Sequence, residues 1–184
     1  MRSIAPLAVA LPLALAVPLE PRDGPEFVLT GLAGTFPYPY PPYGDYSVNS
    51  KLVISVTYPD PSSTTGPPLN TTCSVGWPEG IDPAPTGWTP CAAPSLEFRL
   101  PAYGYTSDTN FTLELWETTS STGSGLFGSQ ILRSNPGNPS DPYGYLFCIQ
   151  KGKFNPLTCD LTGPLGQGSG RVTIPAVEEA VIPA

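Results

Sequence analysis

Few side chains in this sequence could do chemistry, and the lack of one residue type restricts them most. The 184-residue chain contains no histidine, which excludes Ser-His-Asp triads, Cys-His pairs and histidine-ligated metal sites. A glycosidase needs two carboxylates about 5–10 Å apart. Glu97 and Glu114 lie on separate predicted strands and could be neighbours, but each alternates with apolar residues, so we expect both to point to solvent. We predict no catalytic residue, and the Gly-rich stretch 163–170 lacks the lysine of a phosphate loop, so we also predict no cofactor.

The four cysteines are the other reactive side chains, and we expect them to form two disulfides. They are Cys73, Cys91, Cys148 and Cys159. An even number in an exported chain is typical of disulfides, whereas a zinc site would need paired C-x-x-C spacing or histidine. Three pairings are open, and spacing alone does not choose among them. Local pairing would close two short loops, each bridge contributing on the order of 3 kcal/mol.

The first residues predict export. Arg2 precedes an apolar run from Ala5 to Ala16, and Ala14-Leu15-Ala16 fits the small-x-small pattern of a cleavage site. The alternative is a membrane anchor, but the run is shorter than the roughly 20 apolar residues that a span requires. We therefore predict a signal peptide at 1–16, a single secreted domain at 17–184 with its core at about 27–174, and an extracellular location.

Composition limits the partners. The net charge is −7, with 8 basic and 15 acidic residues and no basic cluster. Nucleic acids and anionic membranes both attract a positive patch, so we expect neither as a partner. Two glycosylation sequons, at Asn70 in a predicted loop and at Asn110 at a predicted strand start, are candidates in an exported chain.

The apolar pattern has period two nearly throughout and predicts an all-β protein. Alternating residues favour antiparallel strands with one buried face. Pro (26) and Gly (19) are frequent and suit long turns between short strands. We predict an antiparallel barrel or sandwich of about seven strands with long Pro/Gly-rich loops. The predicted strands are 26–32, 52–58, 96–100, 111–116, 130–132, 145–149 and 171–174, and 177–184 is a loose tail or a short helix.

Prolines and tyrosines alternate between the first two strands. Tyr38, Tyr40, Tyr43 and Tyr46 interleave with prolines, which favour an extended, polyproline-II-like backbone. Tyrosines held in this way could form a binding surface, because aromatic rings stack on sugars or anchor protein partners. The alternative is that they cover Pro-rich loops. For Trp88 we favour packing beside a bridge between Cys73 and Cys91.

The layout of strands and cysteines resembles the fungal family typified by the major allergen of Alternaria. The features that carry the resemblance are the Tyr-rich segment, the strand running from 46–58 towards Cys73, the Trp88-Thr89-Pro90-Cys91 motif, the strand at 96–100, and the pair Cys148 and Cys159. The resemblance implies a small secreted β-barrel. It also implies pairing of the first cysteine with the second and of the third with the fourth. The family's additional N-terminal cysteine is missing here, so a covalent dimer is not implied.

These observations lead to three functional hypotheses. The first, implied by the resemblance, is a secreted non-enzymatic fungal protein that binds at the host interface as an effector, elicitor or allergen-like protein. Its partners would be host proteins or small ligands. The second is a carbohydrate-binding or wall-associated protein that uses exposed Tyr and Trp side chains on a cell-wall polysaccharide. The third is the carboxylate-based glycosidase.

Overall fold

The computed structural model describes residues 24–37, 48–63, 66–78, 86–138, 140–152, 155–161 and 170–184. The predicted signal peptide, at 1–16, lies outside these residues. So do the four tyrosines predicted as a binding surface, Tyr38, Tyr40, Tyr43 and Tyr46.

The described chain is all-β, which confirms the predicted fold class. Its strands are β1 (Glu26–Phe36), β2 (Ser50–Tyr58), β3 (Leu69–Trp77), β4 (Thr89–Pro90), β5 (Leu96–Arg99), β6 (Tyr105–Ser107), β7 (Asn110–Thr118), β8 (Gly125–Arg133), β9 (Leu146–Gln150), β10 (Leu157–Leu161) and β11 (Val172–Glu179). A single 3₁₀ turn, η1 (Ala102–Gly104), lies between β5 and β6.

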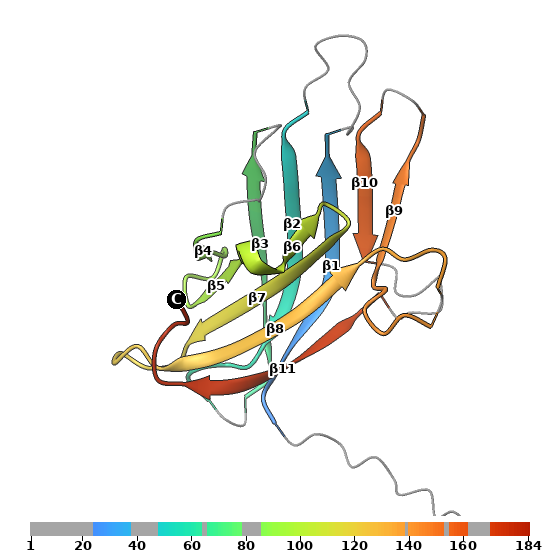
Figure 1. Ribbon diagram of the computed structural model, residues 1–184. Helices are drawn as coiled ribbons and strands as arrows, with labels where there is room; N and C mark the ends of the chain where they lie inside the picture. Colours follow the sequence, from blue (N-terminus) through green and yellow to red (C-terminus); the bar gives the residue numbers. More distant parts are fainter. Residues whose placement is uncertain are drawn as a thin grey trace, which may run out of the picture.

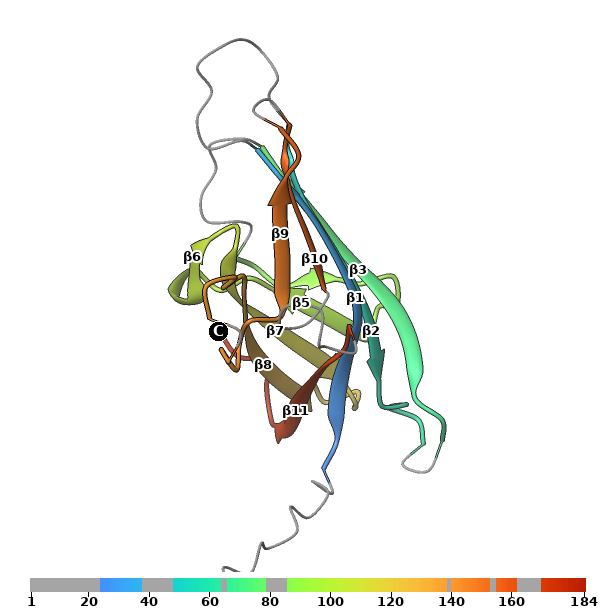
Figure 2. The same ribbon diagram turned by 90° about the vertical axis from the view of Figure 1, so that its right-hand side faces the viewer.

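The strands form one nearly closed, antiparallel, barrel-like sheet in the order β3-β2-β1-β11-β8-β7-β5-β4. The long strands β1, β2 and β3 make one layer, and β7, β8 and β11 run obliquely to it (Figures 1 and 2). The core lies between these layers because every second side chain of each strand points inward. Its largest fully buried members include Phe27, Phe36, Phe98 and Phe111.

Strand β1 connects the two layers. One edge pairs with β2, and the other edge is shared, since Glu26 to Leu29 pair with β11 and Ala33 to Phe36 pair with β10. The register with β2 shifts between Leu29 and Gly31. Such irregularities bend a strand and increase its twist, which lets β1 contribute to both parts of the barrel.

A disulfide closes the seam between the two ends of the strand order. Cys73 on β3 is bonded to Cys91, which follows β4. Two hydrogen bonds flank the bridge, from the Ala92 amide to the Thr72 carbonyl at 2.9 Å and from the Ala93 amide to the Thr71 hydroxyl at 2.9 Å. The segment after β4 therefore covers the edge of β3, which would otherwise expose unpaired backbone groups.

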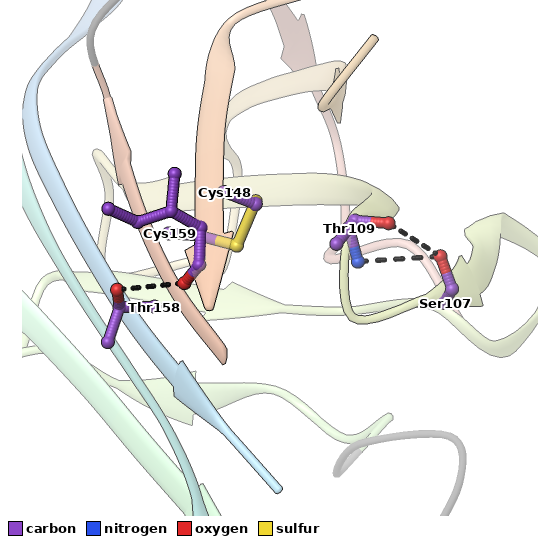
Figure 3. The surroundings of a disulfide bond; sticks show 6 residues. Ser107, Thr109, Cys148, Thr158 and Cys159 are labelled. Carbon is purple, nitrogen blue, oxygen red and sulfur yellow. Dashed lines mark hydrogen bonds between the residues drawn. A yellow bond between two sulfur atoms is a disulfide. The ribbon is translucent and has the colours of Figure 1, made fainter. Parts of the chain in front are cut away.

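The second disulfide joins the hairpin of β9 and β10. Cys148 and Cys159 lie directly opposite each other in the register, with Cα atoms 4.0 Å apart (Figure 3). The Thr158 hydroxyl, on the same hairpin, donates to the Ile149 carbonyl at 3.2 Å. Both disulfides follow the pairing that the family resemblance implied. Two such bridges indicate an oxidising, extracellular-type environment.

The structure corrects several sequence-based predictions about strands. The described residues contain eleven strands rather than about seven. β3 and β10 were not among the predicted strands, because their polar Thr, Asn and Asp side chains hid the alternation. Residues 177–179, predicted as part of a tail or short helix, extend β11 and pair with β8. Asn70 lies on β3 rather than in a loop, where its side-chain oxygen accepts a 2.5 Å hydrogen bond from the Thr57 hydroxyl.

Candidate functional site

Alternation along β5 and β7 places two opposite charges next to each other on the outer face of the barrel. Phe98 and Leu115 form a cross-strand pair in the core, so Arg99 and Glu114, the next pair, face away from it. The Arg99 Nε lies 2.6 Å from the Glu114 Oε2, and both side chains are buried, with exposed fractions of 8% and 2%. A buried, hydrogen-bonded ion pair of this kind holds its members in one geometry.

The 3₁₀ turn after β5 brings an aromatic ring to this ion pair. Pro101 precedes η1, and the Tyr103 hydroxyl donates a hydrogen bond to the Glu114 Oε1. This bond to the carboxylate raises the pKa of Tyr103. Gly104 allows the close approach, since a Cβ at this position would lie 2.3 Å from the Thr112 hydroxyl oxygen of β7. The rest of the Tyr103 side chain projects outward and is 78% exposed.

Trp88 completes the group, which we call the Arg99 cluster: Trp88, Arg99, Tyr103 and Glu114. The Arg99 Cζ lies 4.5 Å from the centroid of the Trp88 ring, in cation–π geometry. The Trp88 Nε1 donates to the Pro183 carbonyl at 2.9 Å. Trp88 thus contacts the Arg99 guanidinium and the C-terminal segment, and its packing beside the Cys73–Cys91 bridge stays a prediction.

The cluster overturns the prediction that Glu114 points to solvent. Glu114 is 1% exposed, and each of its oxygens accepts a hydrogen bond, one from Arg99 and one from Tyr103. Sequence reasoning failed because the partners that cover this outer position come from a turn and a neighbouring strand. Glu97 is partly exposed on the same face, opposite Trp116. The two glutamates are therefore diagonal neighbours, but Glu114 is engaged in an ion pair.

Sequence reasoning missed a second buried carboxylate, Glu117. It continues the inward series Phe111, Leu113 and Leu115 on β7, and it is 0% exposed. Neither of its oxygens has a hydrogen-bond partner. Burial, with a smaller effect of the nearby Asp60 charge, raises the pKa of Glu117 to about 8, so the group is protonated at neutral pH. Glu117 stands at an inward-facing position of the alternating series of β7, and this position could have identified it as a buried carboxylate.

A second ion pair fixes the segment between β8 and β9. Two nitrogens of Arg133 lie 2.5 and 2.7 Å from the two oxygens of Asp141. Asp141 also accepts hydrogen bonds from the side chain of Asn135 and the backbone of Tyr143. The Arg133 guanidinium, followed by these donors, holds the pKa of Asp141 well below its usual range. The centroid of the Tyr143 ring lies 5.5 Å from the Arg133 Cζ, and Tyr143 is 39% exposed, so here too a partly exposed aromatic ring stands beside an ion pair.

A depression of about 470 Å³ lies where β2 begins and β3 ends, and its lining includes Ser50, Lys51, Gly76 and Trp77. Its lining contains one charged side chain. It does not include any candidate site residue from the sequence.

The described part of the chain has no group of three or more His, Cys, Asp or Glu residues placed to hold a metal ion. Within the same residues, no helix has the length and apolarity needed to cross a membrane. Of the two sequons, Asn70 is exposed and Asn110 is partly exposed, and their glycosylation stays a prediction. Comparisons of the chain with protein-family models, curated proteins and solved structures find no match. The resemblance to the Alternaria allergen family likewise stays a prediction.

Proposed function

We propose that this chain is a secreted, non-enzymatic protein that acts by binding at the host interface, and that the Arg99 cluster is its binding surface. One observation carries the proposal. The Tyr103 side chain is 78% exposed, yet its hydroxyl is held by a buried carboxylate that is itself paired with Arg99. An exposed aromatic that is already ordered loses little entropy when a partner covers it.

The remaining support comes from the scaffold and the sequence. Tyr and Arg are the residue types most enriched at the centres of protein interfaces, and both occur in the cluster. The two disulfides suit a protein that works outside the cell, as the predicted signal peptide would require. The resemblance to a fungal family of effectors and allergens agrees with a role in binding.

The test compares the secreted protein with Tyr103→Ala and with a matched control, Tyr143→Ala, which removes the exposed ring of the other ion-pair surface. The proteins are infiltrated into leaves, and the oxidative burst is measured. We expect the wild type and Tyr143→Ala to act alike and Tyr103→Ala to lose at least five-fold in response. An unchanged leaf response with wild-type protein, or equal activity of all three, would contradict the proposal.

Carbohydrate binding is a second candidate function, favoured by the chemistry around the same ring. The exposed Tyr103 ring lies in the same cluster as the Trp88 ring and the Arg99 guanidinium, and the partly exposed Glu97 is the diagonal neighbour of Glu114. Aromatic rings stack on sugars, and charged side chains hydrogen-bond to their hydroxyls. Retention on chitin, glucan or cellulose that is lost in Tyr103→Ala and kept in Tyr143→Ala would favour this function. Hydrolysis of a glycan that is lost in Glu97→Gln would instead favour the glycosidase hypothesis.

A further inference from the structure

The C-terminal residues 180–184 form a strap across the outer face of the barrel. β11 ends at Glu179, which pairs with Gly125 on β8. Pro183 nevertheless contacts Trp88, next to β4, on the far side of β8, β7 and β5 in the strand order. The chain bends at Ala180 and Val181, and the end of the strap lies beside β4 and β5 (Figure 1).

The strap contacts a surface formed by the Trp88 ring and the Arg99 guanidinium, which we call the Trp88–Arg99 shelf. The face of Trp88 is held by Arg99, whose guanidinium is in turn fixed by Glu114. The indole N–H points to the carbonyl of Pro183, with a distance of 2.9 Å between nitrogen and oxygen. Aromatic grooves recognise proline-containing peptides because these peptides are extended before they bind, so binding costs them little entropy.

The contact between strap and shelf is weak. Within the part of the chain that the structure describes, the bond from Trp88 is the only hydrogen bond made by residues 180–184. Val181 is 70% exposed and Ile182 is 37% exposed, so the strap leaves apolar side chains in water. One neutral hydrogen bond favours the bound state by roughly five-fold. A competing peptide needs only a modest advantage to displace the strap.

We propose that the Trp88–Arg99 shelf is a peptide-binding site, occupied in the free protein by the chain's own Ile182-Pro183-Ala184. Its partner is an extended protein segment that contains proline and presents a carbonyl to the Trp88 indole. The inference rests on the proposed binding function and names the class of partner. The strap acts as an internal competitor, so binding requires its release.

The test uses full-length secreted protein labelled with ¹⁵N and the synthetic peptide Ala-Val-Ile-Pro-Ala. The indole resonance of Trp88 is assigned by its loss in Trp88→Phe, which keeps an aromatic ring but removes the N–H donor. A strap variant, Pro183→Gly, loosens the C-terminal segment without shortening the chain. We expect the peptide to shift the Trp88 indole resonance in both proteins, with an affinity at least five-fold higher for Pro183→Gly.

Trp88→Phe/Pro183→Gly has no indole N–H, so its affinity is measured from the backbone amide resonances. It should bind the peptide at least five-fold more weakly than Pro183→Gly does. A control peptide with glycine in place of proline should also bind more weakly. No shift of the indole resonance at millimolar peptide in either protein would overturn the inference. So would equal affinity of Pro183→Gly and Trp88→Phe/Pro183→Gly. If the peptide does not bind but the leaf response depends on Tyr103, only the peptide-binding site is rejected. If the peptide binds but leaves do not respond to the protein, only the host-interface function is rejected.

Discussion

Glu114 and Glu117 lie three residues apart on β7 and meet opposite conditions. Both are almost completely buried. Glu114 faces outward, where Arg99 and Tyr103 each bind one of its oxygens, whereas Glu117 faces the core and has no hydrogen-bond partner. An odd spacing along a strand always places two side chains on opposite faces. The exposed fraction of a buried carboxylate therefore does not tell whether the group is charged, because its charge depends on the hydrogen-bond donors and counter-ions around it.

The largest expected effect comes from breaking the partnered carboxylate. Glu114→Leu leaves the Arg99 charge buried without its counter-ion, and we expect a loss of about 4 kcal/mol in the free energy of unfolding. The double variant Arg99→Met/Glu114→Leu should recover most of this loss, because no charge remains unpaired. Urea unfolding of both variants measures the difference. A loss below about 1 kcal/mol in the single variant would show that water reaches the pair.

The unpartnered carboxylate, Glu117, should instead make the free energy of unfolding depend on pH. The pKa of Glu117 is about 8 in the folded protein and near 4.5 in the unfolded chain, so the folded state holds the extra proton between these values. Stability therefore falls as pH rises through this window. Relative to wild type, Glu117→Gln should gain about 3 kcal/mol between pH 5 and pH 8.

Urea unfolding of wild type and Glu117→Gln at several pH values checks this prediction. Every other titrating group is common to the two proteins, so the difference between the curves isolates Glu117. Parallel curves from pH 5 to pH 8 would mean that the carboxyl has its ordinary pKa. In that case Glu117 would differ from Glu114 only in the face of β7 to which its side chain points.

The smallest expected effect separates the hydroxyl of Tyr103 from its ring. Tyr103→Phe removes the hydrogen bond to Glu114 but leaves Arg99 in place, and we expect a loss of about 1 kcal/mol in stability. Thermal unfolding against a Tyr143→Phe control measures it. If the ring itself makes the binding contact, Tyr103→Phe should keep most of the leaf response that Tyr103→Ala loses. Equal loss in both variants would assign the contact to the hydroxyl.

Parts of the fold could be predicted from local patterns, and the missed parts have a common cause. β2 was predicted at 52–58 and lies at Ser50–Tyr58, because its apolar residues alternate without interruption. β3 and β10 were missed because each has exposed polar residues and uses a cysteine as its buried anchor. A cysteine at such a position gives a weak apolar signal, although it is among the most buried residue types.

The candidate site was less accessible to sequence reasoning. Glu114 was singled out, but as a solvent-exposed side chain, since nothing local shows that η1 folds back over it. The contact between Trp88 and Pro183 joins residues 95 positions apart. Side chains brought together over such distances leave no periodic signal in the chain.

The sequence by itself determined the all-β class, the antiparallel pairing and the exclusion of histidine chemistry, because alternation and residue type are local properties. Only the tertiary structure decided that β1 joins both layers and that Cys91 closes the seam to β3. It also decided which glutamate of β7 is partnered and which is protonated. Alternation assigns each side chain to a face, but the charge it carries there depends on neighbours contributed by distant segments.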